Sequence, residues 1–166
     1  MQRDKTNGTV RIRPLTHSDV PDLQRNCFPE ESLEAVSDYV QRALNYVQRG
    51  QSTHLVAEAG GHAVANAQLL CWRKRAEIGS LVVAEPLRDQ GVGTALIEAL
   101  SDAAVHMGVE QIEIGAEQDN ELALDLYRRL GFYPYKSVRV PGGEANALSG
   151  KTSTIPAPSR ASACTS

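Results

Sequence analysis

Apolar residues follow two different periodicities along this chain, and together they predict a mixed set of strands and helices. Short segments that alternate apolar and polar residues, or that are continuously apolar, are typical of strands, whereas apolar residues three or four positions apart mark one face of a helix. The predicted strands are 10–13, 54–58, 63–72, 77–83, 111–116 and 135–140, and the predicted helices are 19–27, 33–49, 91–107 and 120–130. This order predicts a mixed α/β domain in which an antiparallel meander leads into a βαβ unit.

The composition changes near the end of the chain. Residues 149–166 are rich in Ser, Thr, Ala and Pro. Such a segment buries too little apolar surface to offset the entropy that ordering costs. We therefore predict one domain over residues 9–148, followed by a flexible tail over 149–166.

Length, charge and cysteine content narrow the class of protein. The 166 residues suit a single domain, and 42% of them are hydrophobic, as in globular proteins. A net charge of −3 gives no overall basic excess for nucleic-acid binding. The three cysteines form no CxxC pair, which argues against a metal site or a disulfide framework. No signal-peptide pattern or run of ~20 apolar residues occurs, so we expect a soluble, cytoplasmic protein with no membrane partner.

A loop with two glycines joins the predicted strand 77–83 to the helix that follows. The segment is Arg88-Asp89-Gln90-Gly91-Val92-Gly93-Thr94. Glycine lets the backbone approach a ligand closely, and the free N–H groups and dipole of a first helical turn favour an anion such as phosphate. Leu96 replaces the third glycine of a dinucleotide-binding fingerprint, and the Gly-Lys-Ser/Thr of a P-loop is also missing. The remaining R-x-x-G-x-G pattern also occurs in simple strand-to-helix turns.

Two motifs, in the expected order, resemble those of the GCN5-related N-acetyltransferase (GNAT) superfamily. Residues 82–100, VVAEPLRDQGVGTALIEAL, are similar to its pyrophosphate-binding motif, and residues 120–132 match its N-x-x-A-x-x-L-Y-x-x-x-G-F pattern. The resemblance spans roughly residues 9–141. It implies the GNAT fold, a mixed, mostly antiparallel sheet of six to seven strands flanked by about four helices. It also implies an N-acetyltransferase that uses acetyl-CoA as cosubstrate and needs no metal.

The resemblance further implies which residues bind acetyl-CoA. In this family the strand before the loop diverges from its neighbour, and its free backbone groups bind the acetyl carbonyl and the pantetheine. The matching residues are Leu81, Val82 and Val83. The pyrophosphate would be held by the loop, namely by Arg88, Asp89, Gln90, Gly91, Val92, Gly93 and Thr94. Asn120 matches a residue that contacts CoA, although an Asn here is equally suited to capping the helix.

Tyr127 matches the general acid of the family, which protonates the CoA thiolate as it leaves. At this helical spacing it is also compatible with a core aromatic residue. For the base that removes a proton from the attacking amine, the resemblance leaves several candidate residues. Glu77, eleven residues before Arg88, resembles the base glutamate of the histone acetyltransferase branch.

The ribosomal-protein acetyltransferase branch places its glutamate where this chain has Gly115. Glu113 and Glu117 lie two residues on either side of it, on the same strand face. They are alternatives to Glu77, as is a reaction without any single protein base. His54, His62 and His106 are expected to be surface or packing residues.

The resemblance implies direct transfer to a primary amine of a small molecule or peptide in a ternary complex. Its alternative is a non-catalytic acyl-CoA-binding or regulatory module of the same fold. The segment available for a closing strand, Ala145–Thr152, has little apolar alternation. We therefore expect that strand to be short or to come from a partner subunit, and the second arrangement favours a homodimer.

Overall fold

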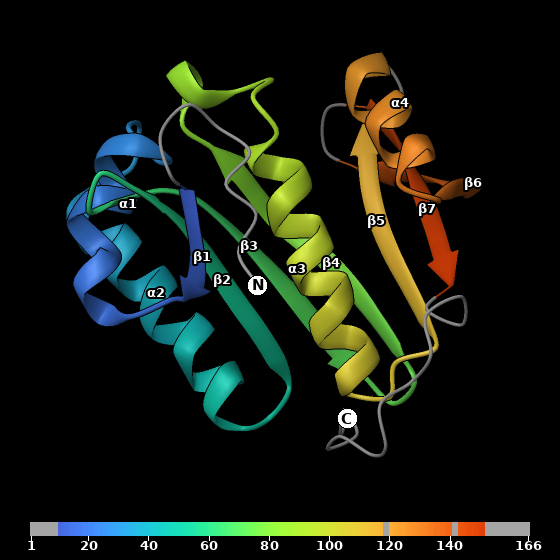
Figure 1. Ribbon diagram of the computed structural model, residues 1–166, viewed down its shortest axis with the longest axis horizontal. Helices are drawn as coiled ribbons and strands as arrows, with labels where there is room; N and C mark the ends of the chain where they lie inside the picture. The colour runs from blue at the N-terminus through green and yellow to red at the C-terminus, as the bar shows by residue number, and fades with distance from the viewer. Residues whose placement is uncertain (1–9, 118–119, 141–142, 152–166) are drawn as a thin grey trace.

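The computed structural model describes residues 10–117, 120–140 and 143–151, and seven strands of this part form one sheet (Figure 1). The order across the sheet is β1-β2-β3-β4-β5-β7-β6. The strands are β1 (Val10–Pro14), β2 (Ser52–Ala59), β3 (His62–Trp72), β4 (Arg75–Val83), β5 (Gln111–Glu117), β6 (Tyr133–Val140) and β7 (Gly143–Lys151). Among these seven strands only β4 and β5 are parallel neighbours, because the chain crosses over between them. The predicted mostly antiparallel sheet is thus confirmed.

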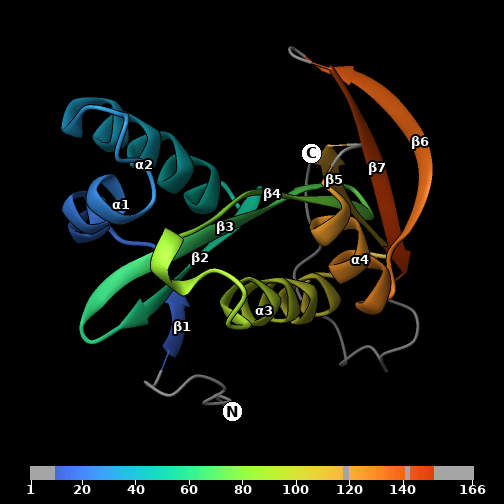
Figure 2. The same ribbon diagram turned by 90° about the horizontal axis from the view of Figure 1, so that it is seen from above.

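Helices cover both faces of this sheet (Figure 2). On one face lie α1 (Val20–Asn26) and α2 (Leu33–Gln48), and on the other lie α3 (Val92–His106) and α4 (Glu121–Arg129). Two short 3-10 turns, η1 (His17–Asp19) and η2 (Glu85–Leu87), precede α1 and α3. The four predicted helices are therefore confirmed, each with ends within two residues of its prediction.

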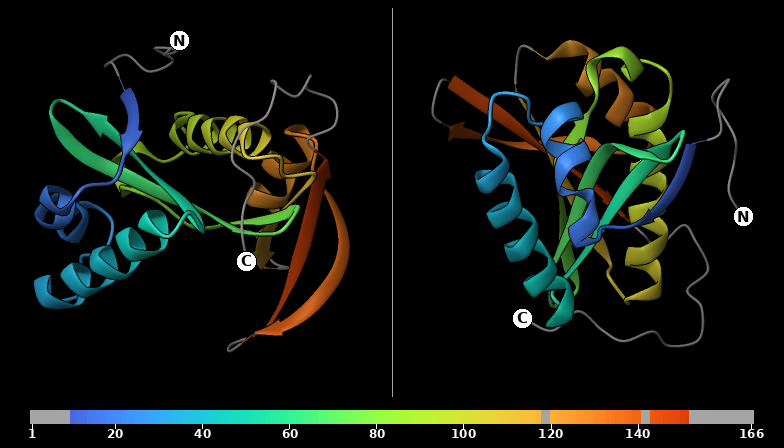
Figure 3. Two further views of the ribbon diagram at one scale, coloured as in Figure 1. Left: turned by 90° about the horizontal axis from the view of Figure 1, so that it is seen from below. Right: turned by 90° about the vertical axis from the view of Figure 1, so that its left-hand side faces the viewer.

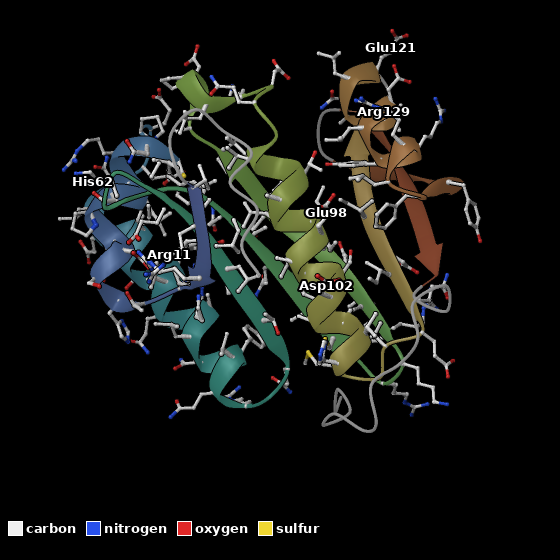
Figure 4. All side chains as sticks on the ribbon, in the orientation of Figure 1. Arg11, His62, Glu98, Asp102, Glu121 and Arg129 are labelled. Atoms are coloured by element: carbon white, nitrogen blue, oxygen red, sulfur yellow. The ribbon has the colours of Figure 1, made fainter. Side chains whose placement is uncertain are left out.

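The two helix layers give two apolar cores, one on each side of the sheet. On the α3 side, Leu96, Ile97 and Leu100 are fully buried and pack against Ile78 of β4 and Ile114 of β5. These helix residues recur at the spacing of one face, whereas Glu98 and Asp102 are exposed on the outward side of α3 (Figure 4).

The second core lies under α1 and α2. Val36, Val40 and Ala43 of α2 pack there with Leu23 of α1 and Val56 of β2. The sheet separates this layer from α3, as the side views show (Figure 3). Successive side chains of a central strand therefore enter different cores, so a residue's position along the strand decides which layer it faces.

The closing strand differs from its prediction. Residues 143–151 form a nine-residue strand, β7, which pairs antiparallel with β5 over Gln111–Glu117 and with β6 on its other side. Hydrogen-bond ladders to two neighbours hold a segment whose own apolar pattern is poor, since strand formation depends strongly on context. The chain supplies this strand itself, so the reason for expecting a homodimer falls away. β7 also continues past the predicted boundary at residue 148, whereas residues 152–166 of the predicted tail lie outside the described residues.

One buried ion pair ties β1 to the turn before α1. The Arg13 guanidinium donates to both carboxylate oxygens of Asp19, at 2.9 and 2.6 Å, and to Glu58 Oε1 at 3.1 Å. Burial by itself raises the pKa of the Asp19 carboxyl, but hydrogen bonds from Arg13 and from the Thr16 backbone outweigh it and hold that pKa below its usual value. Asp19 is therefore ionised at neutral pH and paired with a cation.

Replacing Asp19 with Ala is expected to lower the free energy of unfolding by about 3 kcal/mol, because it leaves Arg13 largely buried without its main partner. Since the folded state lowers the pKa of Asp19, the stabilisation is fully present above the unfolded pKa of about 4 and is lost as the pH falls through the folded value. Urea unfolding at pH 7 and at about pH 3 measures both effects. Asp125→Ala, which removes an exposed carboxylate 3.6 Å from Arg128, is the control. Equal losses in the two variants would contradict the assignment.

Candidate active site

β4 and β5 separate partway along their length. They pair only from Arg75–Gln111 to Ile78–Ile114, although β4 continues to Val83 and β5 to Glu117. The two ribbons diverge toward the end at which α3 begins (Figure 1). On its β5 side, the second half of β4 therefore has no parallel ladder partner among the described residues. Leu81, Val82 and Val83, the predicted acetyl-binding and pantetheine-binding residues, all lie in this half.

A β-bulge marks the same region of β4. The register with β3 shifts between Asn66, opposite Val82, and Gln68, opposite Gly79. Ser80 lies inside the shift and has a positive φ of 53°, which is uncommon for a residue other than glycine. Such bulges re-aim the strand and frequently occur beside functional sites. The bulge and the strand divergence coincide, so this part of β4 presents backbone groups instead of a continued ladder.

The glycine loop lies directly after β4, as predicted. Ala84 and η2 lead into residues 88–91, which are all exposed, and α3 begins at Val92 with Gly91 as its N-cap. Gly91 has a φ of 84°, a conformation that favours glycine. No side chain caps this helix, and its first turn contains no acidic residue. The turn is therefore open to an anion, in agreement with the helix dipole.

Two side chains of the loop stabilise its shape. Arg88 Nε donates to the carbonyl of Val83 at 3.1 Å, and Gln90 Nε2 donates to the carbonyl of Pro86 at 3.0 Å. Arg88 remains exposed, so its guanidinium is available to an anion that binds at the start of α3. Thr94, in the first turn, is half-buried.

Tyr127 lies on the inner side of α4. It is 7% exposed and belongs to the core on the α3 side of the sheet, where its ring makes an edge contact with Phe132. Burial raises the pKa of the Tyr127 phenol above its usual value, so the hydroxyl keeps its proton at neutral pH. The structure thus gives Tyr127 both a packing position and the protonation state that a general acid needs.

Asn120 caps α4, one of its two predicted roles. Its side-chain oxygen accepts a hydrogen bond from the backbone N–H of Ala123 at 3.2 Å. The residue is exposed, and α4 begins at the same end of the molecule as α3, with Glu121 at its tip (Figure 4). Contact between Asn120 and CoA stays a prediction.

The two candidate glutamates on β4 and β5 are direct neighbours. Glu77 and Glu113 are register partners in the parallel pair, just before the strands diverge. They alternate with Ile78 and Ile114 of the α3-side core, so both point to the opposite face, toward the α1 and α2 side. Arg75 forms an ion pair with Glu113, whereas Glu77 is exposed and makes no ion pair with the residues that the structure describes.

Gly115, which lies between the candidate bases Glu113 and Glu117 on β5, is exposed. Glu117 is the last residue of β5, and its side chain lies outside the described part of the structure. The described geometry therefore separates Glu77, which is exposed to solvent, from Glu113, which is held by a guanidinium. Tyr127 belongs to the core on the α3 side of the sheet, whereas Glu77 points to the opposite face.

The cysteines and histidines that the structure describes are either buried in a core or exposed on the surface. Cys27 and Cys71 are buried, and burial raises the pKa of the Cys27 thiol to about 12, so it is not a thiolate at neutral pH. His62 and His106 are exposed. Within residues 10–117, 120–140 and 143–151 no group of three or more His, Cys, Asp or Glu side chains is arranged to hold a metal ion. No helix in the same ranges is long and apolar enough to cross a membrane.

The sequence pattern did not reveal a polar cluster under α2. His54 of β2 and Asn66 of β3 are 2% and 0% exposed, and Asn66 Oδ1 accepts from Tyr39 Oη at 3.0 Å and lies 2.8 Å from His54 Nε2. Polar residues at inward positions of apolar strands were the only signal for it. His54 is thus a packing residue, as predicted, although its partners required the tertiary structure.

Comparison with known proteins assigns the family. The sequence profile of the acetyltransferase (GNAT) family matches residues 17–132. The matched segment contains both motifs described above and more than half of the chain. The protein therefore belongs to the acetyltransferase (GNAT) family.

Two relatives illustrate how far the similarity extends. The chain is 39% identical over 62 residues to N-alpha-acetyltransferase 30 of Schizosaccharomyces pombe, a match that covers 37% of this chain and 41% of the relative. It is 31% identical over 139 residues to an uncharacterized N-acetyltransferase of Methanocaldococcus jannaschii, which covers 75% of this chain and 61% of the relative. The chain thus matches less than two thirds of the length of either protein.

A solved structure shares the fold. RimL, a ribosomal L7/L12 alpha-N-protein acetyltransferase in complex with coenzyme A, has a TM-score of 0.75 at 18% identity, over 89% of this chain and 96% of its own. At this identity the similarity concerns the fold alone. The fold predicted from the two motifs is confirmed.

Proposed function

We propose that the protein transfers the acetyl group of acetyl-CoA to a primary amine by direct attack in a ternary complex. The observation that carries this proposal is the combination of a β4 segment that leaves β5 with an uncapped, acid-free helix start directly after it. A thioester linked to a pyrophosphate needs two kinds of contact: backbone groups along its extended arm and N–H groups around its phosphates. The free half of β4 offers the first, and the start of α3 offers the second. Membership of the acetyltransferase (GNAT) family supports the same reading.

In the proposed reaction the nitrogen lone pair attacks the thioester carbonyl carbon. A backbone N–H near Val83 holds the oxygen that becomes negative, and the C–S bond then breaks. The thiolate takes a proton from the Tyr127 phenol, and the proton of the former ammonium passes to Glu77, directly or through water. In the tetrahedral intermediate the nitrogen and the sulfur are separate substituents of one carbon, so an acid and a base on different faces of the sheet serve separate atoms.

The acceptor is proposed to be the α-amine of a peptide. Two relatives that match more than a third of this chain at 39% and 40% identity are named N-alpha-acetyltransferases. Small amines are the other acceptor class, and a non-catalytic acyl-CoA-binding module of the same fold is the alternative function. Neither has a feature of its own in the described part of the structure that favours it.

A thermal-shift panel with acetyl-CoA, CoA, ATP and NAD tests cofactor choice, because a ligand that binds only the folded state raises the Tm. We expect shifts with acetyl-CoA and CoA. A shift with ATP or NAD but none with acetyl-CoA would contradict the proposal. Mass spectrometry of a pool of short peptides and small amines after incubation with acetyl-CoA then tests turnover. Binding without any acetylated product would favour the non-catalytic module.

Glu77→Gln is expected to lower kcat by about 10²-fold, the lower end for one acid–base group, because the carboxylate is exposed and water is a substitute base. Steady-state rates at several pH values measure the change, and the loss should shrink as the pH rises and more amine is already neutral. Glu110→Gln, which alters an exposed carboxylate paired with Lys74, is the control. If Glu113→Gln loses activity while Glu77→Gln does not, Glu113 is the base.

A further inference from the structure

The phenol of Tyr39 is held in one orientation by its neighbours. Its ring makes edge contacts with Phe28 and with His54, at centroid distances of 5.4 and 5.8 Å. Its hydroxyl donates to Asn66 Oδ1 at 3.0 Å. Because Asn66 Oδ1 already accepts this bond, the 2.8 Å contact with His54 Nε2 makes that nitrogen a second donor. The His54 ring is then neutral, in keeping with burial, which lowers its pKa.

This cluster lies beside the half of β4 that diverges from β5. Asn66 is the register partner of Val82, and Tyr39 and Val82 pack against the same core. Ser80, in the bulge of the same half of β4, is exposed. Tyr39 is half-buried and its hydroxyl bonds to the fully buried Asn66, so the phenol oxygen lies where the core under α2 meets β3 and β4.

Tyr39 also borders a cavity. A space of about 280 Å³ is lined by Phe28, Glu31, Ala35, Val36, Tyr39 and Arg42. Four of the lining residues are apolar or aromatic, and Glu31 and Arg42 add one acidic and one basic side chain. Tyr39 thus lines this cavity and also packs against the same core as Val82 of β4, on the face of the sheet toward which Glu77 points.

We propose that Tyr39 positions the acceptor, with its phenol oxygen accepting a hydrogen bond from the N–H of the attacking amine, and that Asn66 and His54 orient that phenol. The inference rests on the proposed acetyl transfer to a peptide α-amine. A phenol has one proton and two lone pairs. The proton is directed to Asn66, which leaves the lone pairs of the phenol oxygen to accept from the amine. Asn66 acts through Tyr39 and is a positioning residue.

The expected consequence is a change in KM for the amine and not in kcat. The phenol binds the amine before and during attack, so its loss weakens both states equally. Tyr39→Phe should raise the KM for a peptide with a free α-amine on the order of 10-fold, as for one lost hydrogen bond, while kcat stays within about threefold. The Kd for acetyl-CoA and the Tm should remain near the wild-type values, because the ring and its packing are retained.

The experiment uses a pool of tetrapeptides with free α-amines, from which the best acceptor of the wild-type protein is chosen for kinetics. Tyr46→Phe makes the same chemical change at a 43% exposed tyrosine of the same helix and is the matched control. Asn66→Leu tests positioning, since it removes the acceptor of the Tyr39 proton in a side chain of similar size, and it too should raise KM more than it lowers kcat.

The outcomes distinguish failure of the proposed function from failure of the role of Tyr39. A wild-type protein that does not bind acetyl-CoA contradicts the proposed function itself. A protein that binds acetyl-CoA but acetylates no peptide of the pool contradicts the proposed transfer to a peptide, and the role given to Tyr39 fails with it. An active wild type whose KM is unchanged in Tyr39→Phe overturns this inference alone. If Asn66→Leu does not fold, Tyr39→Phe still decides the outcome.

Discussion

Gly91→Glu is expected to abolish acetyl-CoA binding. The substitution places a carboxylate at the N-cap of α3, where the proposed pyrophosphate approaches uncapped N–H groups. Two like charges at this site repel, and the new side chain occupies the approach that glycine leaves open. We expect no acetyl-CoA-dependent rise in Tm and no detectable heat of binding by calorimetry at ligand concentrations that saturate the wild type.

The main complication of this substitution is backbone strain, for which the same helix provides a control. Gly91 has a φ of 84°, so any other residue is strained there by about 1–2 kcal/mol. Gly108, just past the end of α3, has a φ of 74°, and at both glycines a Cβ atom would meet no other atom within 4 Å. Gly108→Glu therefore introduces similar strain and the same charge at the opposite end of the helix. Acetyl-CoA binding that survives in both variants would refute the pyrophosphate site.

Tyr127→Phe is expected to lower kcat by ~10²–10⁴-fold while acetyl-CoA still binds, the usual range for one acid–base group. The change removes a hydroxyl and keeps the ring that contacts Phe132. Without the phenol, the CoA thiolate leaves without a proton from the protein. Because burial raises the pKa of Tyr127, the wild-type enzyme should remain active well into the alkaline range and lose activity only as the phenol ionises. The residual activity of the variant should not show this loss at alkaline pH, because it has no phenol to ionise.

Stability and binding must be measured for Tyr127→Phe alongside its rate, since the residue is 7% exposed and part of the core. Tyr133→Phe, at a 50% exposed tyrosine six residues later, is the matched control and should keep the wild-type rate. A Tyr127→Phe protein with full turnover would show that the phenol is not the acid. Protonation by water, or departure as the free thiolate, would then have to suffice.

The anion-binding loop was predictable because its chemistry is local. Contiguous residues from 82 to 94 contain the end of a strand, a glycine that needs a positive φ and the start of a helix, and each is set by interactions within a few residues. The same holds for α3 and α4, whose apolar spacing alone indicates the buried face. Asn120 is a partial case, since its capping role follows from the residue type, whereas a CoA contact does not.

The relation between the two glutamates was not predictable, because it depends on the register of two strands that are far apart in the chain. Only the paired sheet shows that Glu77 lies opposite Glu113 and that Arg75 engages the second and not the first. A shift of either strand by one residue would have turned its own carboxylate into the α3-side core. The place where β4 leaves β5 is likewise a property of the pair of strands and not of either one.

Periodicity and motif thus determined the order of the elements, the fold class and the position of the loop, since these arise from short-range propensity and from side-chain spacing along one element. The tertiary structure decided which chain supplies the closing strand, because β7 is held by ladders to β5 and β6 in spite of its poor apolar pattern. It also decided the setting of Tyr39. Its partners Asn66 and His54 come from two strands of the sheet, and only long-range packing buries them and brings them within hydrogen-bond distance.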